Sequence, residues 1–405
     1  GVQTCALPIF AYQQAQVDAL RALCPEHSIT TNMMGFGFQD INYYELARPL
    51  DFVSWDNYPG YQPSDPAAVA LSHTLMRGLL DRPFWVMEQQ AGPTGWQTMS
   101  RAPKPGQLRL WAYQAIAHGA DAVVFFRWRT CRFNTEEYWH GILDHDGVPR
   151  RRYEEIKTMG GEVARIGDRL VGAASPKAVA MLFSYDDSFA FRLQPNARDF
   201  SYSELFSNYY RAFHQLGLPV DVVSPEADLS GYRVVVAPTL HVLPDAWADK
   251  LRRYVEQGGW LIVGARSGVK DTNNRVVDLA LPGLLRDLCG VEVAEYDPLG
   301  RNATNAVRFE GENGAGCTVH TWCDVLQPFD ADVVGRYTED YYAGQAAITQ
   351  RAVGAGGVIY VGCMGNGDLY GAVAKLAAQE AQLAPLLIAP RGVEVTAREN
   401  RGVTY

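Results

Sequence analysis

The sequence predicts an α/β protein built on parallel β-sheets. Three observations support this fold class. Short apolar runs alternate with segments of helical spacing, each apolar run is nearly continuous, and polar or aromatic residues follow the runs in the first third of the chain. Near-continuous apolar strands that alternate with helices are typical of a parallel sheet covered by helices.

The first elements are a helix and two strands. Residues 12–23, YQQAQVDALRAL, have apolar positions at helical spacing, and Cys24 and Pro25 end the helix because proline cannot continue it. The β-branched stretch SITTNMMG, residues 28–35, predicts a short strand. The run DFVSWDNYPG, residues 51–60, predicts a second strand before a Pro-Gly turn.

Two more helix and strand pairs follow. Ser64 and Asp65 offer an N-cap, with Pro66 at the first helical position, for the helix AAVALSHTLMRGLL. The third strand is FWVMEQQ. The next helix, GQLRLWAYQAIAHG at residues 106–119, closes on a glycine and precedes the fourth strand, DAVVFFRWR at residues 121–129.

Polar and aromatic residues gather at the carboxyl ends of these four strands. They are Asn32, Asp56, Tyr58, Glu88, Arg127 and Arg129. A (β/α)8 barrel builds its active site at this end of its strands. A doubly wound open sheet also collects residues there, but no G-x-G-x-x-G sequence follows any of these strands. The pattern therefore favours a barrel.

A second α/β pattern begins at Lys177. In order it contains AVAMLFS as a strand, YSELFSNYYRAFHQLG as a helix, YRVVVAP as a strand, DAWADKLRRYVEQGG as a helix and WLIVGA as a strand. We expect a separate small parallel-sheet domain that extends to about Leu387. The residues beyond APRGVEV then form only the first strand of a further domain.

Composition excludes several classes of function. Hydrophobic residues make up 47% of the chain and charged residues 20%, and no apolar run approaches the length that crosses a bilayer. We therefore expect no membrane insertion. The net charge of -9 and the dispersed arginines argue against a nucleic-acid partner, which would require a basic face.

The cysteines favour a cytoplasmic protein. The seven form no C-x-x-C pair and no cluster with histidines at metal spacing, so we interpret them as reduced thiols and expect no metal or cofactor. They are Cys5, Cys24, Cys131, Cys289, Cys317, Cys323 and Cys363. No signal peptide is recognisable, and residues 1–10 resemble translated adapter sequence, so we interpret them as a non-native leader.

Glu88 ends a strand that is buried on both faces, in FWVMEQQAGPTGWQ. An unpaired buried carboxylate is too costly to retain, so Glu88 either pairs with an arginine at the sheet edge or takes part in chemistry. Its company at the strand ends favours chemistry, because a carboxylate among aromatic and polar side chains is typical of a sugar-binding subsite. These neighbours are Tyr58, Trp96, Phe126, Arg127, Glu137 and His140.

Three segments resemble the β-galactosidases of glycoside hydrolase family 42. They are DFVSWDNYP, FWVMEQQAGPTGWQ and FFRWRTCRFNTEEYWHGILDHDG, in this order and at this spacing. The resemblance covers the chain from Tyr12 to its end. It implies the fifth to eighth strands of a (β/α)8 TIM barrel, followed by a class I glutamine amidotransferase-like domain that builds a homotrimer. It also implies a retaining hydrolase that releases terminal β-D-galactose from β-galactoside oligosaccharides.

The resemblance also sets the expected domains and site residues. Residues 11–157 would form the partial barrel, 158–387 the trimerisation domain and 388–405 the start of a truncated C-terminal β domain. Glu88 corresponds to the nucleophile. The substrate-binding positions are Tyr58, Trp96, Phe126, Glu137 and His140.

Several of these residues also have alternative interpretations that do not involve sugar binding. The E-x-x-H spacing of Glu137 and His140 could serve a metal, but no third ligand is in sight, and the choice of Glu137 over Glu136 depends on that spacing alone. We expect Arg127 and Arg129 to pair with carboxylates. In the second domain YRVVVAP is followed by Thr-Leu-His with no cysteine nucleophile, so we expect assembly and not amidotransferase activity.

The second catalytic carboxyl group is not found. Retaining hydrolysis needs two carboxyl groups about 5 Å apart, and the family supplies its acid/base as the glutamate of an Asn-Glu pair after the fourth strand. No such pair stands at a strand end here. The resemblance therefore implies that the first barrel half, with the acid/base and the zinc-binding cysteines of the family, is missing and that this chain alone is inactive.

Asp56 and Glu137 are weak substitutes for that acid/base, because sugar binding or ion pairing explains both. Two alternative functions stay open. One is hydrolysis of α-L-arabinopyranosides, which differ from galactosides by one hydroxymethyl group. The other is a non-catalytic sugar-binding or assembly subunit.

Overall fold

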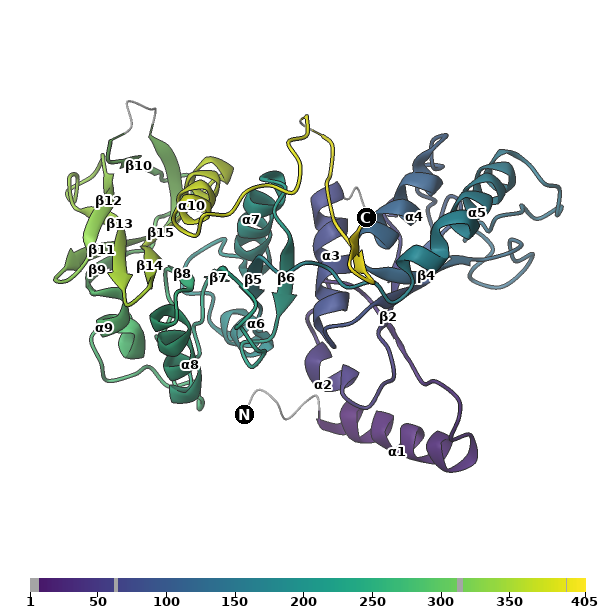
Figure 1. The fold of residues 1–405 in the computed structure, drawn as a ribbon, viewed down its shortest axis with the longest axis horizontal. Helices are drawn as coiled ribbons and strands as arrows, with labels where there is room; N and C mark the ends of the chain where they lie inside the picture. Colours follow the sequence, from purple (N-terminus) through teal and green to yellow (C-terminus); the bar gives the residue numbers. More distant parts are fainter. Residues whose placement is uncertain (1–6, 62–64, 312–315, 391) are drawn as a thin grey trace. The chain divides into compact units, whose positions relative to one another are not determined.

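The structure is a computed structural model that describes residues 7–61, 65–311, 316–390 and 392–405. The chain forms two compact units. One contains the described residues up to Pro176 together with Thr396–Tyr405, and the other contains Lys177–Val395. In sequence, the second unit is therefore an insertion into the first (Figure 1).

The first unit alternates helices with parallel strands. Its elements are α1 (Leu7–Leu23), β1 (Asn32–Met33), α2 (Tyr43–Ala47), β2 (Ser54–Asn57), α3 (Pro66–Gly78), β3 (Phe84–Gln90), α4 (Gln107–Ala117), β4 (Ala120–Phe126) and α5 (Arg151–Leu170). The four strands form one sheet in the order β1-β2-β3-β4, and each neighbouring pair is parallel. This is the strand arrangement of part of a (β/α)8 barrel, as the sequence predicted.

Local sequence sets the ends of these helices. α1 ends at Leu23, just before Cys24 and Pro25. The Asp65 carboxylate caps α3 by accepting a hydrogen bond from the Ala67 amide at 3.1 Å, while Ser64 lies outside the described residues. Beyond the end of α4, Gly119 has a φ of +113°, a conformation that side chains with a Cβ rarely adopt.

Two helices of the first unit were not predicted. α2 is short and is capped by Asn42, whose side chain accepts from the Tyr44 amide at 3.0 Å. α5 carries a single fully buried residue, Met159, so most of its surface is charged or polar. The expected domain boundary after residue 157 falls inside α5, because this helix continues the first unit to Leu170 and the unit ends at Pro176.

The C-terminal segment packs on the first unit. We expected residues 388–405 to begin a further β domain, and its β16 (Glu399–Asn400) and β17 (Val403–Thr404) do form a hairpin. Arg398 just before it is buried, and its guanidinium donates four hydrogen bonds of 3.0–3.1 Å within the first unit. The acceptors are the carbonyl oxygens of Ile116, Ala120 and Ala173 and the carboxylate of Asp121.

The second unit contains a larger, mixed sheet. Its elements begin with β5 (Val179–Leu182), α6 (Tyr185–Leu193), α7 (Tyr202–Gln215), β6 (Val220–Val223), β7 (Val234–Ala237), α8 (Asp245–Glu256), β8 (Trp260–Gly264), η2 (Gly283–Leu285) and α9 (Arg286–Cys289). They continue with β9 (Val291–Asp297), β10 (Asn305–Phe309), β11 (Cys317–Pro328), β12 (Asp332–Tyr337), β13 (Ala346–Val353), β14 (Gly356–Val361), β15 (Cys363–Gly365) and α10 (Gly367–Glu380).

Strands of both directions make up this 11-stranded sheet. β14, β8, β7, β5 and β6 pair in parallel, which includes every strand that the sequence predicted. The sheet then continues through antiparallel β13, β12, β10, β11 and β15, with β9 paired to β11. The prediction of a small, purely parallel sheet was therefore wrong in its extent.

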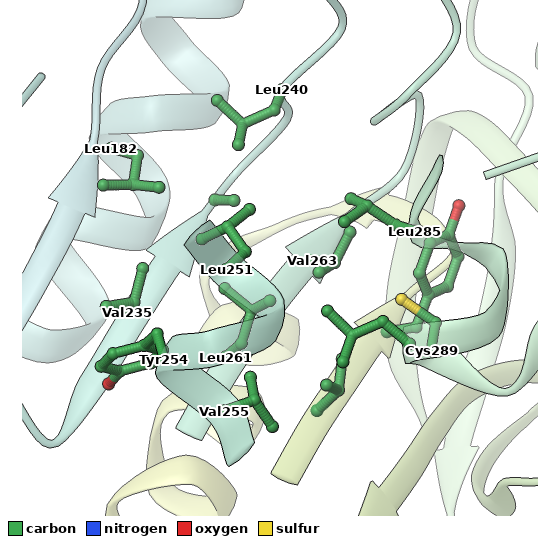
Figure 2. Packing of buried hydrophobic residues seen from close by; sticks show 14 of the residues in the cluster. Leu182, Val235, Leu240, Leu251, Tyr254, Val255, Leu261, Val263, Leu285 and Cys289 are labelled. Carbon is green, nitrogen blue, oxygen red and sulfur yellow. The ribbon is translucent and has the colours of Figure 1, made fainter. Parts of the chain in front are cut away.

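The core of the second unit lies between the parallel strands and the helices that cover them. Leu261 and Val263 of β8 pack with Leu251 and Val255 of α8 and with Leu285 in one buried cluster (Figure 2). After β7, Thr239, Leu240 and His241 are all fully buried. The strand end where an amidotransferase would present its nucleophile is thus packed into the protein.

Within the described residues, no helix combines the length and the apolar character that a bilayer crossing requires.

The buried contacts of Arg398 predict a stability effect. Replacing it by glutamine (R398Q) leaves Asp121 without its cation and removes the guanidinium that donates to three carbonyl oxygens, so we expect a loss of about 3 kcal/mol in the free energy of unfolding. R401Q, in the exposed turn of the same hairpin, should change it by less than about 0.5 kcal/mol. Urea unfolding of the two variants tests this, and equal stabilities would contradict it.

Candidate active site

Glu88 lies near the carboxyl end of β3 and is half-buried. Its Oε2 accepts a hydrogen bond of 2.6 Å from the hydroxyl of Tyr58, which follows β2. Within the described residues Glu88 makes no ion pair, so the alternative of an arginine partner at the sheet edge is not what the structure shows. The carboxylate is held by one neutral donor and is not neutralised.

The backbone around Glu88 is irregular on both sides of β3. The β2–β3 ladder shifts register between Trp55 and Asp56, and the β3–β4 ladder shifts between Val86 and Gln89. Such bulges locally change the direction in which a strand presents its side chains, and they are common next to active sites. The shift in the β2–β3 ladder sets Asp56 directly opposite Glu88.

Buried amides brace the loops that follow β2 and β3. Gln89 accepts from the Asn57 amide at 3.0 Å. Gln90 accepts from the Gly60 backbone N–H at 2.7 Å and donates to the Gly92 carbonyl at 2.9 Å. These amides connect the two loops. The sequence analysis did not identify them, because their only sequence signal is that they are polar residues at the end of an apolar run.

An aromatic cluster stands beside Glu88, with Trp139 at its centre. The Trp139 ring lies 4.8 Å from the rings of both Tyr58 and Trp96, 5.6 Å from Tyr61 and 6.5 Å from Phe126. Trp139 is buried, whereas Trp96 is 54% exposed and offers a ring to solvent. The structure thus brings together the predicted Tyr58, Trp96 and Phe126 and adds Trp139, which carried no strand-end signal.

The segment after β4 contributes polar side chains. Arg127 forms an ion pair with Glu136, as its predicted structural role requires, and its guanidinium lies over the Phe126 ring at 4.3 Å. Arg129 differs from the expectation, because it donates to the carbonyl oxygen of His145 at 2.6 Å and not to a carboxylate.

Glu137 and His140 take less central positions. The His140 Nδ1 lies 3.1 Å from the carbonyl oxygen of Pro93, in the loop after β3. The Glu137 carbonyl oxygen lies 2.8 Å from the His145 Nε2. Among the described residues, no hydrogen bond joins either side chain to Glu88, and no three His, Cys, Asp or Glu residues gather as a metal-ligand set.

Two ionisable groups beside Glu88 are strongly perturbed. Burial and the hydrogen-bonded Glu88 carboxylate raise the pKa of Tyr58, so its hydroxyl stays protonated and donates over the working pH range. Burial, with a smaller contribution from the Glu88 charge, raises the pKa of Asp56 to about 7, against the lowering effect of the Asn32 amide. The site therefore combines a carboxylate without an ion pair, Glu88, with a hydroxyl donor, Tyr58, and an exposed aromatic ring, Trp96. These are groups that can bind a sugar and react with it.

Comparison with known proteins identifies the family of the chain. Two family profiles match the chain, "Beta-galactosidase" over residues 7–166 and "Beta-galactosidase trimerisation domain" over residues 177–384. The chain belongs to the family 42 β-galactosidases. The two matched regions fall within the two compact units of the structure.

Curated family 42 relatives extend the match to almost the whole chain. The β-galactosidase BgaA of Clostridium cellulovorans is 36% identical, and the match covers 97% of this chain and 60% of the relative. The β-galactosidase Bga of Halorubrum lacusprofundi is 37% identical, with 97% and 59% covered. The chain therefore spans about 60% of the length of these relatives.

Solved structures show the same arrangement. The crystal structure of β-galactosidase from Bacillus circulans sp. alkalophilus superposes with a TM-score of 0.91 at 32% identity, covering 98% of this chain and 61% of that one. The fold class predicted from the sequence, a partial TIM barrel followed by a trimerisation domain, is confirmed.

The amide brace predicts a site-specific stability loss. In Q90A the Gly60 N–H and the Gly92 carbonyl lose their buried partner, so we expect a loss of about 3 kcal/mol in the free energy of unfolding. The fluorescence of Trp96 should change as well, because its loop is released. The matched control Q97A alters an exposed glutamine next to Trp96 and should leave both the free energy of unfolding and the fluorescence unchanged. Equal urea midpoints for Q90A and Q97A would exclude a role for the brace.

Proposed function

We propose that the polypeptide to which this chain belongs is a retaining β-galactosidase, with Glu88 as its nucleophile. The observation that carries the proposal is the position of Glu88, half-buried near the carboxyl end of a barrel strand and held by the Tyr58 hydroxyl at 2.6 Å. Barrel enzymes assemble their catalytic groups at this end. The relatives are β-galactosidases by name, which supports a galactoside as the substrate.

In the first step a Glu88 oxygen attacks the anomeric carbon of the galactoside. A bond from this carbon to the carboxylate forms while its bond to the leaving oxygen breaks, and the leaving oxygen takes a proton from an acid. In the second step the same group, now a base, takes a proton from a water molecule whose oxygen bonds to the anomeric carbon, and the bond from this carbon to Glu88 breaks. Tyr58 restrains the carboxylate throughout, because its hydrogen bond fixes one oxygen and leaves the other available for attack.

The aromatic cluster supports sugar binding beside this carboxylate. The exposed ring of Trp96 would stack on the apolar C–H face of the galactose ring, and Phe126 would line the pocket. Glu137 and His140 would bind the sugar hydroxyl groups after small movements, since His140 already contacts the loop after β3.

We infer that the acid/base comes from sequence beyond this chain. Asp56 is 8% exposed and faces Glu88 from the next strand, so it cannot reach a leaving group across the sugar. Glu136 is engaged by Arg127. The greater length of the relatives gives room for a further carboxylate.

Covalent labelling tests the nucleophile without the missing acid. A 2-deoxy-2-fluoro-β-galactoside with a dinitrophenolate leaving group needs no protonation, so the chain should form a stable adduct that peptide mass spectrometry places on Glu88. E88Q should not be labelled, whereas E154Q, a matched control at an exposed glutamate of α5, should still be labelled. Azide should release a galactosyl azide from an activated galactoside in the unaltered chain.

Other results would favour the alternatives. Absence of any adduct, with retained galactose binding, would indicate a sugar-binding subunit and exclude the proposal. A faster reaction with nitrophenyl α-L-arabinopyranoside than with nitrophenyl β-galactoside would move the substrate to arabinopyranosides.

The second unit supports assembly into a trimer. Its match to a trimerisation domain covers residues 177–384. Light scattering of the purified chain should therefore give a mass about three times its 44.8 kDa. A monomer mass at micromolar concentration would contradict this proposal and leave the assignment of Glu88 unaffected.

A further inference from the structure

Asp56 and Glu88 form a pair of carboxyl groups on neighbouring strands. They occupy opposed positions of the β2–β3 ladder, next to the register shift after Trp55. Like charges at such neighbouring positions repel where water is excluded, and the Glu88 charge contributes to the raised pKa of Asp56. Within the described residues, no cation pairs with either group.

The surroundings of the two carboxyl groups are unequal. Glu88 is half-buried, and its Oε2 accepts a hydrogen bond of 2.6 Å from the Tyr58 hydroxyl. Asp56 is buried, its Oδ2 accepts one hydrogen bond of 2.7 Å from the Asn32 amide, and its Oδ1 is buried with no hydrogen-bond partner. A buried carboxylate oxygen without a donor is costly, so a single proton shared by the pair belongs on Asp56.

The other titratable groups near Asp56 do not alter this balance. Tyr58 and Tyr43, the latter from α2, both feel the Asp56 charge, and the pKa of each is raised mainly by burial, so both remain neutral. The remaining polar neighbour, Asn32 of β1, is an uncharged amide. Glu88 is thus the charged group that faces Asp56 from the packed elements.

We propose that Asp56 is a positioning residue that holds a proton beside the nucleophile, so that Glu88 alone carries the negative charge of the pocket. The Asn32 amide fixes the Asp56 side chain from the next strand. Asp56 is thus linked to β1 by this hydrogen bond, while in the β2–β3 ladder it stands opposite Glu88. The role of Glu88 in this inference rests on the proposed function, whereas the proton on Asp56 does not.

The pH dependence of thermal stability reports whether Asp56 keeps its proton, and this measurement does not require catalytic activity. An aspartate with a raised pKa loses stability as the pH rises from its unfolded value near 4 to its folded value of about 7, and the loss is then constant. The neutral isostere D56N does not share this loss. We therefore expect the Tm of D56N minus that of the unaltered chain to increase by about 5 °C or more between about pH 4.5 and about pH 8.

Two further variants make this comparison specific. The pKa of Asp51 is lowered by the Ile29 amide and Arg21, so its carboxyl ionises below this window and the Tm difference for D51N should be flat. N32A removes the donor that favours ionised Asp56, so the decline in stability with rising pH should continue above pH 7. This variant tests the proposal even if D56N folds poorly. The proposal would be overturned if the Tm difference between D56N and the unaltered chain did not vary with pH, or if N32A had the same pH dependence of stability as the unaltered chain.

Labelling of Glu88 tests the positioning role. At about pH 6, D56N should react with the fluorinated galactoside within about threefold of the unaltered chain, because both carry a neutral group at this position. As the pH rises through about 7, the unaltered chain should slow while D56N does not, since ionised Asp56 repels the Glu88 carboxylate. Identical pH profiles of labelling for D56N and the unaltered chain would overturn the positioning role of Asp56. If neither chain is labelled, Glu88 is not the nucleophile, and the stability test alone decides whether Asp56 holds a proton.

Discussion

The hydrogen bond from Tyr58 to Glu88 can form only if β2 and β3 lie side by side with their carboxyl ends level. Parallel pairing meets this condition, because every strand then contributes its last residues to the same edge. The polar residues of the site lie in the last residues of β2 and β3 and in the loops that follow. The site therefore depends on strand register before it depends on any individual side chain.

Register alone does not hold the loops that carry the aromatic side chains. The turn after β2 and the loop after β3 are joined by Gln90, and Asn57 bonds to Gln89 below them. These amides satisfy backbone groups that an apolar side chain would leave unpaired. The sequence EQQ thus combines one charged residue for chemistry with two neutral residues that support the surrounding backbone.

The strands of the first unit could be predicted from sequence because each lies in or next to a short run of apolar or β-branched residues that ends in polar residues. Tyr58 and Glu88 share a strand-end pattern, so their proximity followed from the fold. Trp139 could not be found in this way, because it lies in an irregular segment after β4 and reaches the cluster through tertiary packing. The antiparallel strands from β9 to β13 escaped prediction because many of their residues are exposed or half-buried, so they lack continuous apolar runs.

The anchoring of Arg398 constrains the order of events during synthesis. Its acceptors at residues 116–121 and 173 emerge from the ribosome early, but the guanidinium follows only after the whole insertion Lys177–Val395 has been translated. The inserted unit is contiguous and can collapse as it emerges. The barrel strands, although made before the insertion, acquire this internal cation only after the insertion has been translated, so the second unit can fold before the first unit is complete.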